Sequence, residues 1–110
     1  MSRPEDPVQR QLEAYNARDL ERFVAEYTED VEVFRPPAAE PVLAGKPAFS
    51  AHYAAHRFNL PALHARVVQR IVCGEVVVDH EEVSGIGPDP VNAVAVYKVV
   101  GDRIRAVWFF

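Results

Sequence analysis

The first part of the chain carries apolar side chains at helical spacing. Val8, Leu12 and Tyr15 form one stripe behind Asp6, which suits an N-cap and is followed by proline at the first helical position. The pattern predicts a first helix that ends at Asn16.

Two more helices are expected before the pattern changes. Asp19 can cap a short helix that runs to Tyr27, since Phe23 and Val24 continue its apolar stripe. A third helix is expected to open with Gly-Lys-Pro at residue 45 and to end at the Leu-Pro pair that begins at residue 60.

The rest of the chain reads as extended segments. A short alternating run from Val31 to Arg35 precedes two prolines and is typical of an edge strand, with a loop over 38–44. From His64 onward β-branched residues dominate, and turns that contain glycine divide the runs. The runs predict four antiparallel strands, at His64 to Cys73, Val76 to Val83, Val91 to Val100 and Arg103 to Phe110.

Helices gathered first and long strands gathered last indicate a single α+β domain over residues 1–110, with the helices on one face of a sheet. On the strand from Val91 to Val100, alternation puts Asn92, Val94, Val96 and Lys98 on one face and Val91, Ala93, Ala95, Tyr97 and Val99 on the other. Both faces are largely apolar. We therefore expect helices to cover one face and a partner subunit to cover the other.

The composition and charge of the chain argue against several classes of function. The 110 residues are 49% hydrophobic and 25% charged, with a net charge of -4 and no basic cluster, which argues against nucleic-acid binding. The apolar runs are too short to span a membrane, and the N-terminus lacks a signal sequence, so a cytoplasmic protein is expected. The single cysteine, Cys73, excludes an internal disulfide and is expected to be a small core residue.

Several segments resemble the nuclear transport factor 2-like superfamily, in particular its SnoaL-like and ketosteroid isomerase-like branch. They are the stretch from Tyr15 to Leu20, the stretch from Tyr27 to Val33, Gly-Lys-Pro at residue 45, and the ending from Ala95 to Phe109. The resemblance implies a cone-shaped half-barrel, a cystatin-like curved antiparallel sheet wrapped around three N-terminal helices, and commonly a homodimer. It leaves the reaction open, because this fold hosts isomerases, cyclases, hydrolases, dehydratases and binding proteins without catalysis.

The catalytic set of ketosteroid isomerases is missing from this chain. The resemblance places the isomerase tyrosine at Gln11, its proton-shuttling carboxylate at Arg35 and its aspartate near Ala95. Steroid isomerisation by that mechanism is therefore not expected. Arg35 still occupies a position that the family uses, where a guanidinium could hold a ligand carboxylate or phosphate, or an enolate; the alternative is a surface arginine paired with Glu32 or Glu40.

Aromatic residues are the next candidates for the pocket. Tyr97 lies on the strand that lines the pocket in the family, and we expect it to act with Arg35 as a catalytic side chain. The other expected ligand-binding residues are Tyr15, Tyr53, Ala95, Trp108 and Phe110. For the aromatic residues, core packing is the alternative.

The histidines complete the set of candidates. His80 shares a strand face with Glu82 and could form a proton-transfer pair, or it could belong to a polar patch at the solvent end of the strand. His52 and His56 lie one helical turn apart, but without a third ligand they are expected to be exposed rather than to bind a metal.

The sequence thus favours a pocket protein that performs cofactor-free acid–base chemistry, of isomerase or hydrolase type, on a small apolar molecule. Neither a nucleophile motif nor a phosphate-binding or dinucleotide-binding glycine loop is present, so no cofactor and no metal are expected. The alternative is a non-catalytic module that binds a ligand or a protein with the same fold.

Overall fold

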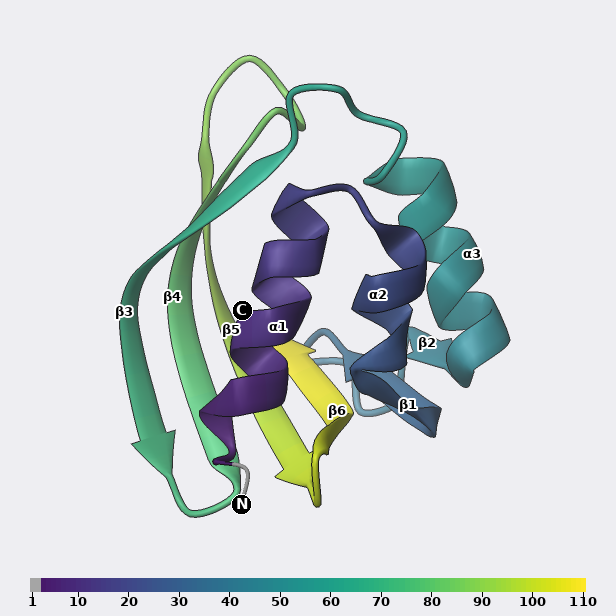
Figure 1. Ribbon diagram of the computed structural model, residues 1–110, viewed down its shortest axis with the longest axis vertical. Coiled ribbons are helices and arrows are strands. Elements are labelled where there is room, and N and C mark those ends of the chain that lie inside the picture. The colour runs from purple at the N-terminus through teal and green to yellow at the C-terminus, as the bar shows by residue number, and fades with distance from the viewer. Residues whose placement is uncertain (1–2) are drawn as a thin grey trace.

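The computed structural model describes residues 3–110 as three helices and one six-stranded sheet (Figure 1). The helices are α1 (Glu5–Asn16), α2 (Leu20–Ala25) and α3 (Lys46–His56). The strands are β1 (Tyr27–Phe34), β2 (Leu43–Ala44), β3 (His64–Cys73), β4 (Val76–Ser84), β5 (Val91–Val100) and β6 (Arg103–Phe109). No helix in this described part is long and apolar enough to cross a membrane. A cytoplasmic location stays a prediction.

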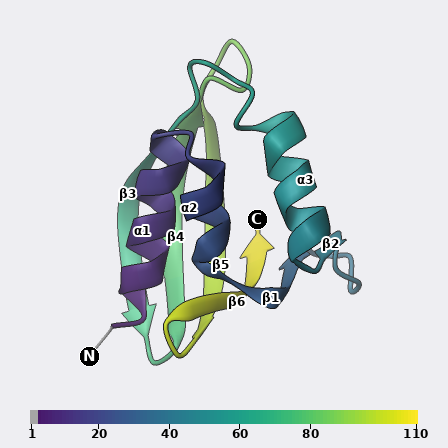
Figure 2. The ribbon, with the colours of Figure 1, turned by 45° about the vertical axis from the view of Figure 1, so that its right-hand side comes forward.

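The sheet has the strand order β2-β1-β6-β5-β4-β3. Its last four strands form the predicted antiparallel meander, whereas β1 runs parallel to β6 and joins the sheet beside it. Figure 2 shows the sheet curving around α1 and α2, with α3 lying over the end formed by β1 and β2. The predicted α+β class, with helices on the concave face of a curved sheet, is confirmed.

Three predicted boundaries were wrong for local reasons. The first helix begins at Glu5, before the predicted Asp6 cap, because Pro4 already has helical dihedral angles; the Asp6 carboxylate instead accepts from the Arg3 N–H at 2.8 Å. The second helix ends at Ala25, so that Tyr27 opens β1. The third helix ends at His56, four residues before the expected stop.

The edge of the sheet also differs from the prediction. Leu43 pairs with Val33 inside the segment predicted as a loop, so β2 is the edge strand and β1 lies between β2 and β6. At the other edge, Cys73 is exposed at the end of β3 rather than buried in the core. The predicted cap of the second helix is confirmed, because the Asp19 carboxylate accepts from the N–H of Arg22 at 3.2 Å.

The core lies between the concave face and the helices. On β5 the face that carries Ala95, Tyr97 and Val99 is the buried one. The alternation in the sequence did not show which of the two faces of the strand packs against the helices. Aromatic rings fill the space between the helices and the sheet at centroid distances of 4.4–6.4 Å, and they belong to Tyr15, Phe23, Tyr27, Phe49, Tyr53 and Phe58.

Two local contacts position α1 against β3 and bring two loops together. The Asn16 amide bonds both backbone groups of Ala65 on β3, donating to its carbonyl at 2.9 Å and accepting from its N–H at 2.7 Å. At the far end of β4, Gly85 has φ of +89° and lies so close to Ala62 that a Cβ would stand 2.2 Å from the Ala62 carbonyl oxygen. The loops 57–63 and 85–90 therefore touch at the top of the molecule in Figure 1.

Candidate active site

A cavity of about 210 Å³ opens between the helices and the concave face of the sheet. It is smaller than the roughly 300–1,000 Å³ of sites for drug-sized ligands, so it suits a smaller molecule. Its aromatic walls are Tyr15, Phe23, Tyr27, Tyr53, Tyr97, Phe109 and Phe110. Its polar lining residues are Gln11, Arg35, Arg57, Glu81 and Asn92, but the Asn92 side-chain oxygen lies 3.0 Å from the ring of the exposed His80 and so faces away from the cavity.

Gln11 organises the hydroxyl groups on one side of the cavity. Its buried amide nitrogen donates to the Val8 carbonyl at 2.9 Å and to the Tyr97 hydroxyl at 3.4 Å, while its amide oxygen accepts from the Tyr27 hydroxyl at 3.1 Å. Because the Val8 carbonyl can only accept, the orientation of the amide is fixed. The Tyr97 oxygen therefore accepts from Gln11, and its own proton stays available to a ligand.

Glu81 is the acidic residue of the cavity. It extends from β4 toward the helices and is 9% exposed, and no hydrogen bond or ion pair joins its carboxyl to another residue within 3–110. Burial raises the pKa of Glu81 to about 7, and the neighbouring Asp79 charge adds to the rise while Arg70 opposes it. A carboxyl that titrates near neutral pH can serve as either acid or base.

Asp79 is the other inward-facing acidic residue of β4, and unlike Glu81 it is ion-paired. Asp79 is fully buried and forms a bidentate ion pair with Arg70, at 2.7 Å from Nε to Oδ1 and 3.0 Å from Nη2 to Oδ2. Arg70 also donates to the side chain of Gln9 on α1 at 3.0 Å. Asp79 is thus a structural anion that binds the sheet to α1, whereas Glu81 is free to meet a ligand.

The tyrosines of the cavity are held in their neutral, hydrogen-bond-donating form. Burial raises the pKa of Tyr15 to about 12 and raises that of Tyr53 further, although Arg57 opposes both rises. Burial also raises the pKa of Tyr27 and of Tyr97 well above the ordinary value of 10. These hydroxyls can donate to an oxygen atom of a ligand, but they do not ionise near neutral pH.

Two arginines from separate elements reach the cavity. Arg35 directly follows β1, and its guanidinium carbon lies 5.1 Å from the centre of the Phe109 ring. Arg57 directly follows α3 and donates to the His56 carbonyl at 2.8 Å. Both line the cavity with Tyr53, and the charges of both lower the pKa of the Tyr53 hydroxyl against the effect of burial.

The chain matches one known protein family over most of its length. The profile of the SnoaL-like domain matches residues 8–107 of the chain. The chain belongs to the SnoaL-like domain family. The resemblance noted in the sequence is therefore confirmed. No curated protein was found to match the chain.

Solved structures agree with this assignment of the SnoaL-like domain. An uncharacterised cystatin-fold protein from Novosphingobium aromaticivorans is 26% identical with a TM-score of 0.87, over 100% of this chain and 99% of the other. An NTF2-like protein of unknown function from Cytophaga hutchinsonii is 13% identical with a TM-score of 0.82, over 100% and 90%. A proposed ketosteroid isomerase from Kribbella flavida is 18% identical with a TM-score of 0.82, over 97% and 76%. The nuclear transport factor 2-like, cystatin-like fold is thereby confirmed.

Five of the residues expected at the site of the SnoaL-like domain do line the cavity, and three do not. Those in the lining are Arg35, Tyr15, Tyr53, Tyr97 and Phe110. Arg35 is exposed, as in the alternative of a surface arginine, but it does not pair with Glu32 or Glu40; Glu32 pairs with Arg105 at 3.0 Å. Ala95 is fully buried in the core and does not line the cavity, whereas Ala93 on the same face of β5 does. The catalytic roles of Arg35 and Tyr97 stay predictions.

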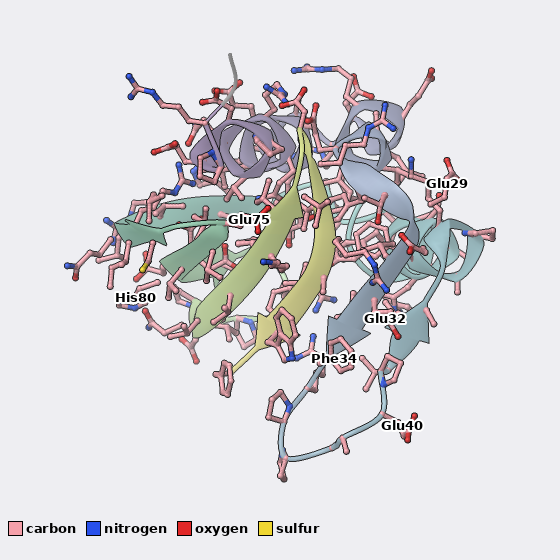
Figure 3. All side chains as sticks on the ribbon, turned by 90° about the horizontal axis from the view of Figure 1, so that it is seen from below. Glu29, Glu32, Phe34, Glu40, Glu75 and His80 are labelled. Carbon is pink, nitrogen blue, oxygen red and sulfur yellow. The ribbon has the colours of Figure 1, made fainter. Side chains whose placement is uncertain are left out.

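His80 and Trp108 lie on the other face of the sheet. His80 is exposed, its ring nitrogen is 3.0 Å from the Asn92 side-chain oxygen, and in Figure 3 it lies on the side of β4 away from α1. The Trp108 ring stacks on Phe34 at a centroid distance of 5.2 Å, so Phe109 takes the place in the cavity wall that Trp108 was expected to hold. The placement of both residues at the pocket was wrong, because strand alternation turns their neighbours inward.

Glu81, Arg57 and Gln11 are the polar cavity residues with inward side chains that the sequence did not single out as site candidates. Glu81 shares its strand face with Asp79, but only the pairing of Glu81 with Ala93 on β5 shows that this face is the concave one. Arg57 follows a helix that was predicted to continue past it. His52 and His56 lie 5.0 Å apart by ring centres, and no group of three residues that could hold a metal occurs among the described residues.

Proposed function

We propose that this SnoaL-like domain catalyses cofactor-free proton transfer at a carbon atom of a small, largely apolar carbonyl compound, with Glu81 as the base. The observation that carries the proposal is the Glu81 carboxyl, which is buried at an aromatic cavity without an ion pair or hydrogen bond in the described chain. Because its pKa is about 7, a substantial fraction of Glu81 is ionised at neutral pH and the protonated form is equally accessible.

The reaction needs only groups of the protein. The Glu81 carboxylate removes a proton from the carbon beside the carbonyl group, and the electron pair of the broken C–H bond moves to the carbonyl oxygen as an enolate. The Tyr97 hydroxyl, whose oxygen already accepts from Gln11, donates its proton as a hydrogen bond to that oxygen. Glu81 then returns the proton to the same carbon or to another carbon of the enolate, and the second course is an isomerisation.

The surroundings support this chemistry on an apolar molecule. Aromatic and aliphatic side chains make most of the wall, so few water molecules compete with the substrate for the carboxylate. A proposed ketosteroid isomerase is among the similar structures, which supports an enolisable carbonyl compound as the class of substrate. The residues differ from the isomerase set, since the base is placed on β4 rather than at the end of β1.

We also propose a homodimer formed through the outer face of the sheet. Phe34 and Trp108 stack there at an interplanar angle of 11° and are both half-buried in the single chain. Phe34 is labelled in Figure 3, on the side away from α1 and α2. Light scattering coupled to gel filtration is expected to give the mass of two chains, and a Phe34→Lys variant is expected to give one. A wild-type monomer at micromolar concentration would refute the dimer.

The proposed reaction can be tested without knowing the natural substrate. Proton transfer at carbon exchanges hydrogen for deuterium in heavy water, and NMR can follow this exchange in phenylpyruvate, phenylacetone and 2-tetralone. The wild-type protein is expected to accelerate exchange in at least one of them, and Glu81→Gln to lower the rate by about a hundredfold or more. Glu82→Gln is the matched control, because Glu82 is the next residue on β4 and faces outward toward Arg66.

Two results would contradict the proposal. One is an absence of accelerated exchange in all three compounds, which would favour a binding module without catalysis. The other is a Glu81→Gln variant that exchanges as fast as the wild type, which would assign any activity to another group. Circular dichroism melts of each variant show whether a loss of rate reflects a loss of folded protein.

A further inference from the structure

We infer that the molecule bound in this cavity carries a carboxylate group, which Arg35 and Arg57 hold at the entrance while the rest of the molecule faces Glu81. The inference deepens the proposed function, because it names the substrate class of the same site as a small oxo acid or related acid rather than a neutral ketone.

The arginines of this chain differ in their partners. Arg10, Arg70 and Arg105 each form ion pairs with carboxylates at 2.7–3.1 Å. Within the described residues, no such pair is formed by Arg35 or Arg57, although the chain has more acidic than basic residues. The same is true of Arg18, Arg22 and Arg103, but these three do not line the cavity, whereas Arg35 and Arg57 do. Two guanidinium groups that line one cavity without a carboxylate partner leave a place for an anion from outside the chain.

The two arginines come from different elements of the fold. Arg35 follows β1 and Arg57 follows α3, so two elements that approach from different directions bring positive charge to one rim of the cavity. Both charges act on the hydroxyl of Tyr53, which belongs to the aromatic cluster and also lines the cavity. Arg35 is exposed and Arg57 is half-buried, which places the guanidinium groups at the entrance and leaves the buried Glu81 inside.

The chemistry of the guanidinium group also suits a carboxylate ligand. A guanidinium presents a planar pair of N–H donors that matches a carboxylate, and the Phe109 ring beneath Arg35 supports that group without neutralising it. When Glu81 removes a proton beside a carbonyl group, negative charge develops on the ligand. Positive charge at the entrance stabilises a ligand that is already an anion and becomes more negative during the reaction.

A binding experiment tests the inference separately from turnover. The probes are three pairs of an acid and its neutral amide: phenylacetate and phenylacetamide, cinnamate and cinnamamide, and 1-naphthylacetate and its amide. Dissociation constants are measured by calorimetry for the wild type, Arg35→Gln, Arg57→Gln and the double variant. Arg66→Gln is the control, because Arg66 is an exposed arginine that is paired with Glu82 on the outer face.

We expect at least one acid to bind the wild type about tenfold or more tightly than its amide. Each single substitution is expected to weaken binding of that acid by about tenfold and the double variant by more, with binding of the amide and the Arg66→Gln control unchanged. Equal binding of acids and amides, wild-type affinity for acids in the double variant, or no binding of any acid would overturn the inference.

The outcomes also separate this inference from the proposed function. If Glu81-dependent exchange occurs in neutral ketones while acids bind no better than amides, proton transfer stands and the carboxylate site is wrong. If acids bind through both arginines but no compound exchanges, the anion site stands and the proposed catalysis is wrong.

Discussion

Replacing Glu81 by glutamine should change how stability depends on pH, whatever the ligand is. In the folded protein the pKa of Glu81 is about 7 against an ordinary value of 4.5, so folding favours the protonated form. The associated stability is fully present below about pH 4.5 and is lost as pH rises to about 7. At about 1.4 kcal/mol per pH unit, ionised Glu81 lowers the free energy of unfolding by about 3 kcal/mol at pH 8.

The assay is urea denaturation of the wild type and Glu81→Gln between pH 4 and pH 8, with Glu82→Gln as the control on the same strand. Glutamine stays neutral, so the variant should gain about 3 kcal/mol relative to the wild type between these two pH values. Subtracting the two proteins removes the titration of all other groups. A difference that stays constant from pH 4 to pH 8 would refute the argument that burial of this carboxyl raises its pKa.

Three further substitutions test contacts that support the site, each by chemical denaturation. Arg70→Met leaves the buried Asp79 carboxylate without its partner and should cost about 3 kcal/mol or more, whereas Arg66→Met on the surface should cost less than about 1 kcal/mol. Asn16→Leu removes two hydrogen bonds to the backbone of β3 and should cost about 2 kcal/mol; a loss under about 0.5 kcal/mol would contradict this. Gly85→Ala should cost at least about 2 kcal/mol, because of its positive φ and the nearby carbonyl of the loop 57–63, and a thermal midpoint equal to the wild type would contradict it.

Local pattern was enough to predict most of the fold. Alternation on β5 separated Tyr97 from Val96, and Asp19 capped α2 as expected, because both signals depend on neighbours within a few residues. The two-residue strand β2 carried no such signal. It exists because Leu43 meets Val33 across a loop, and such a pairing depends on where the loop returns rather than on the residues in it.

The site was harder to predict for the same reason. Val77 and Val83 lie on one face of β4, and Val76 and Val78 lie on the other. Because both faces carry valines, apolar spacing did not show whether His80 or Glu81 faces the cavity. The irregular six-residue segment before β5 hides the register that pairs Glu81 with Ala93. Arg35 was found because a resemblance supplied its position, and no local feature of the sequence marked Arg57.

The parallel pairing of β1 with β6 has a consequence for how the chain assembles during synthesis. Tyr27 on β1 is matched with Ile104 on β6, so the neighbour of β1 leaves the ribosome more than seventy residues later. Until then β1 and its short partner β2 cannot join the rest of the sheet. In contrast, β3, β4 and β5 can pair in order through their turns. The long separation predicts slow folding for a domain of this size, with closure of the cone as its last step.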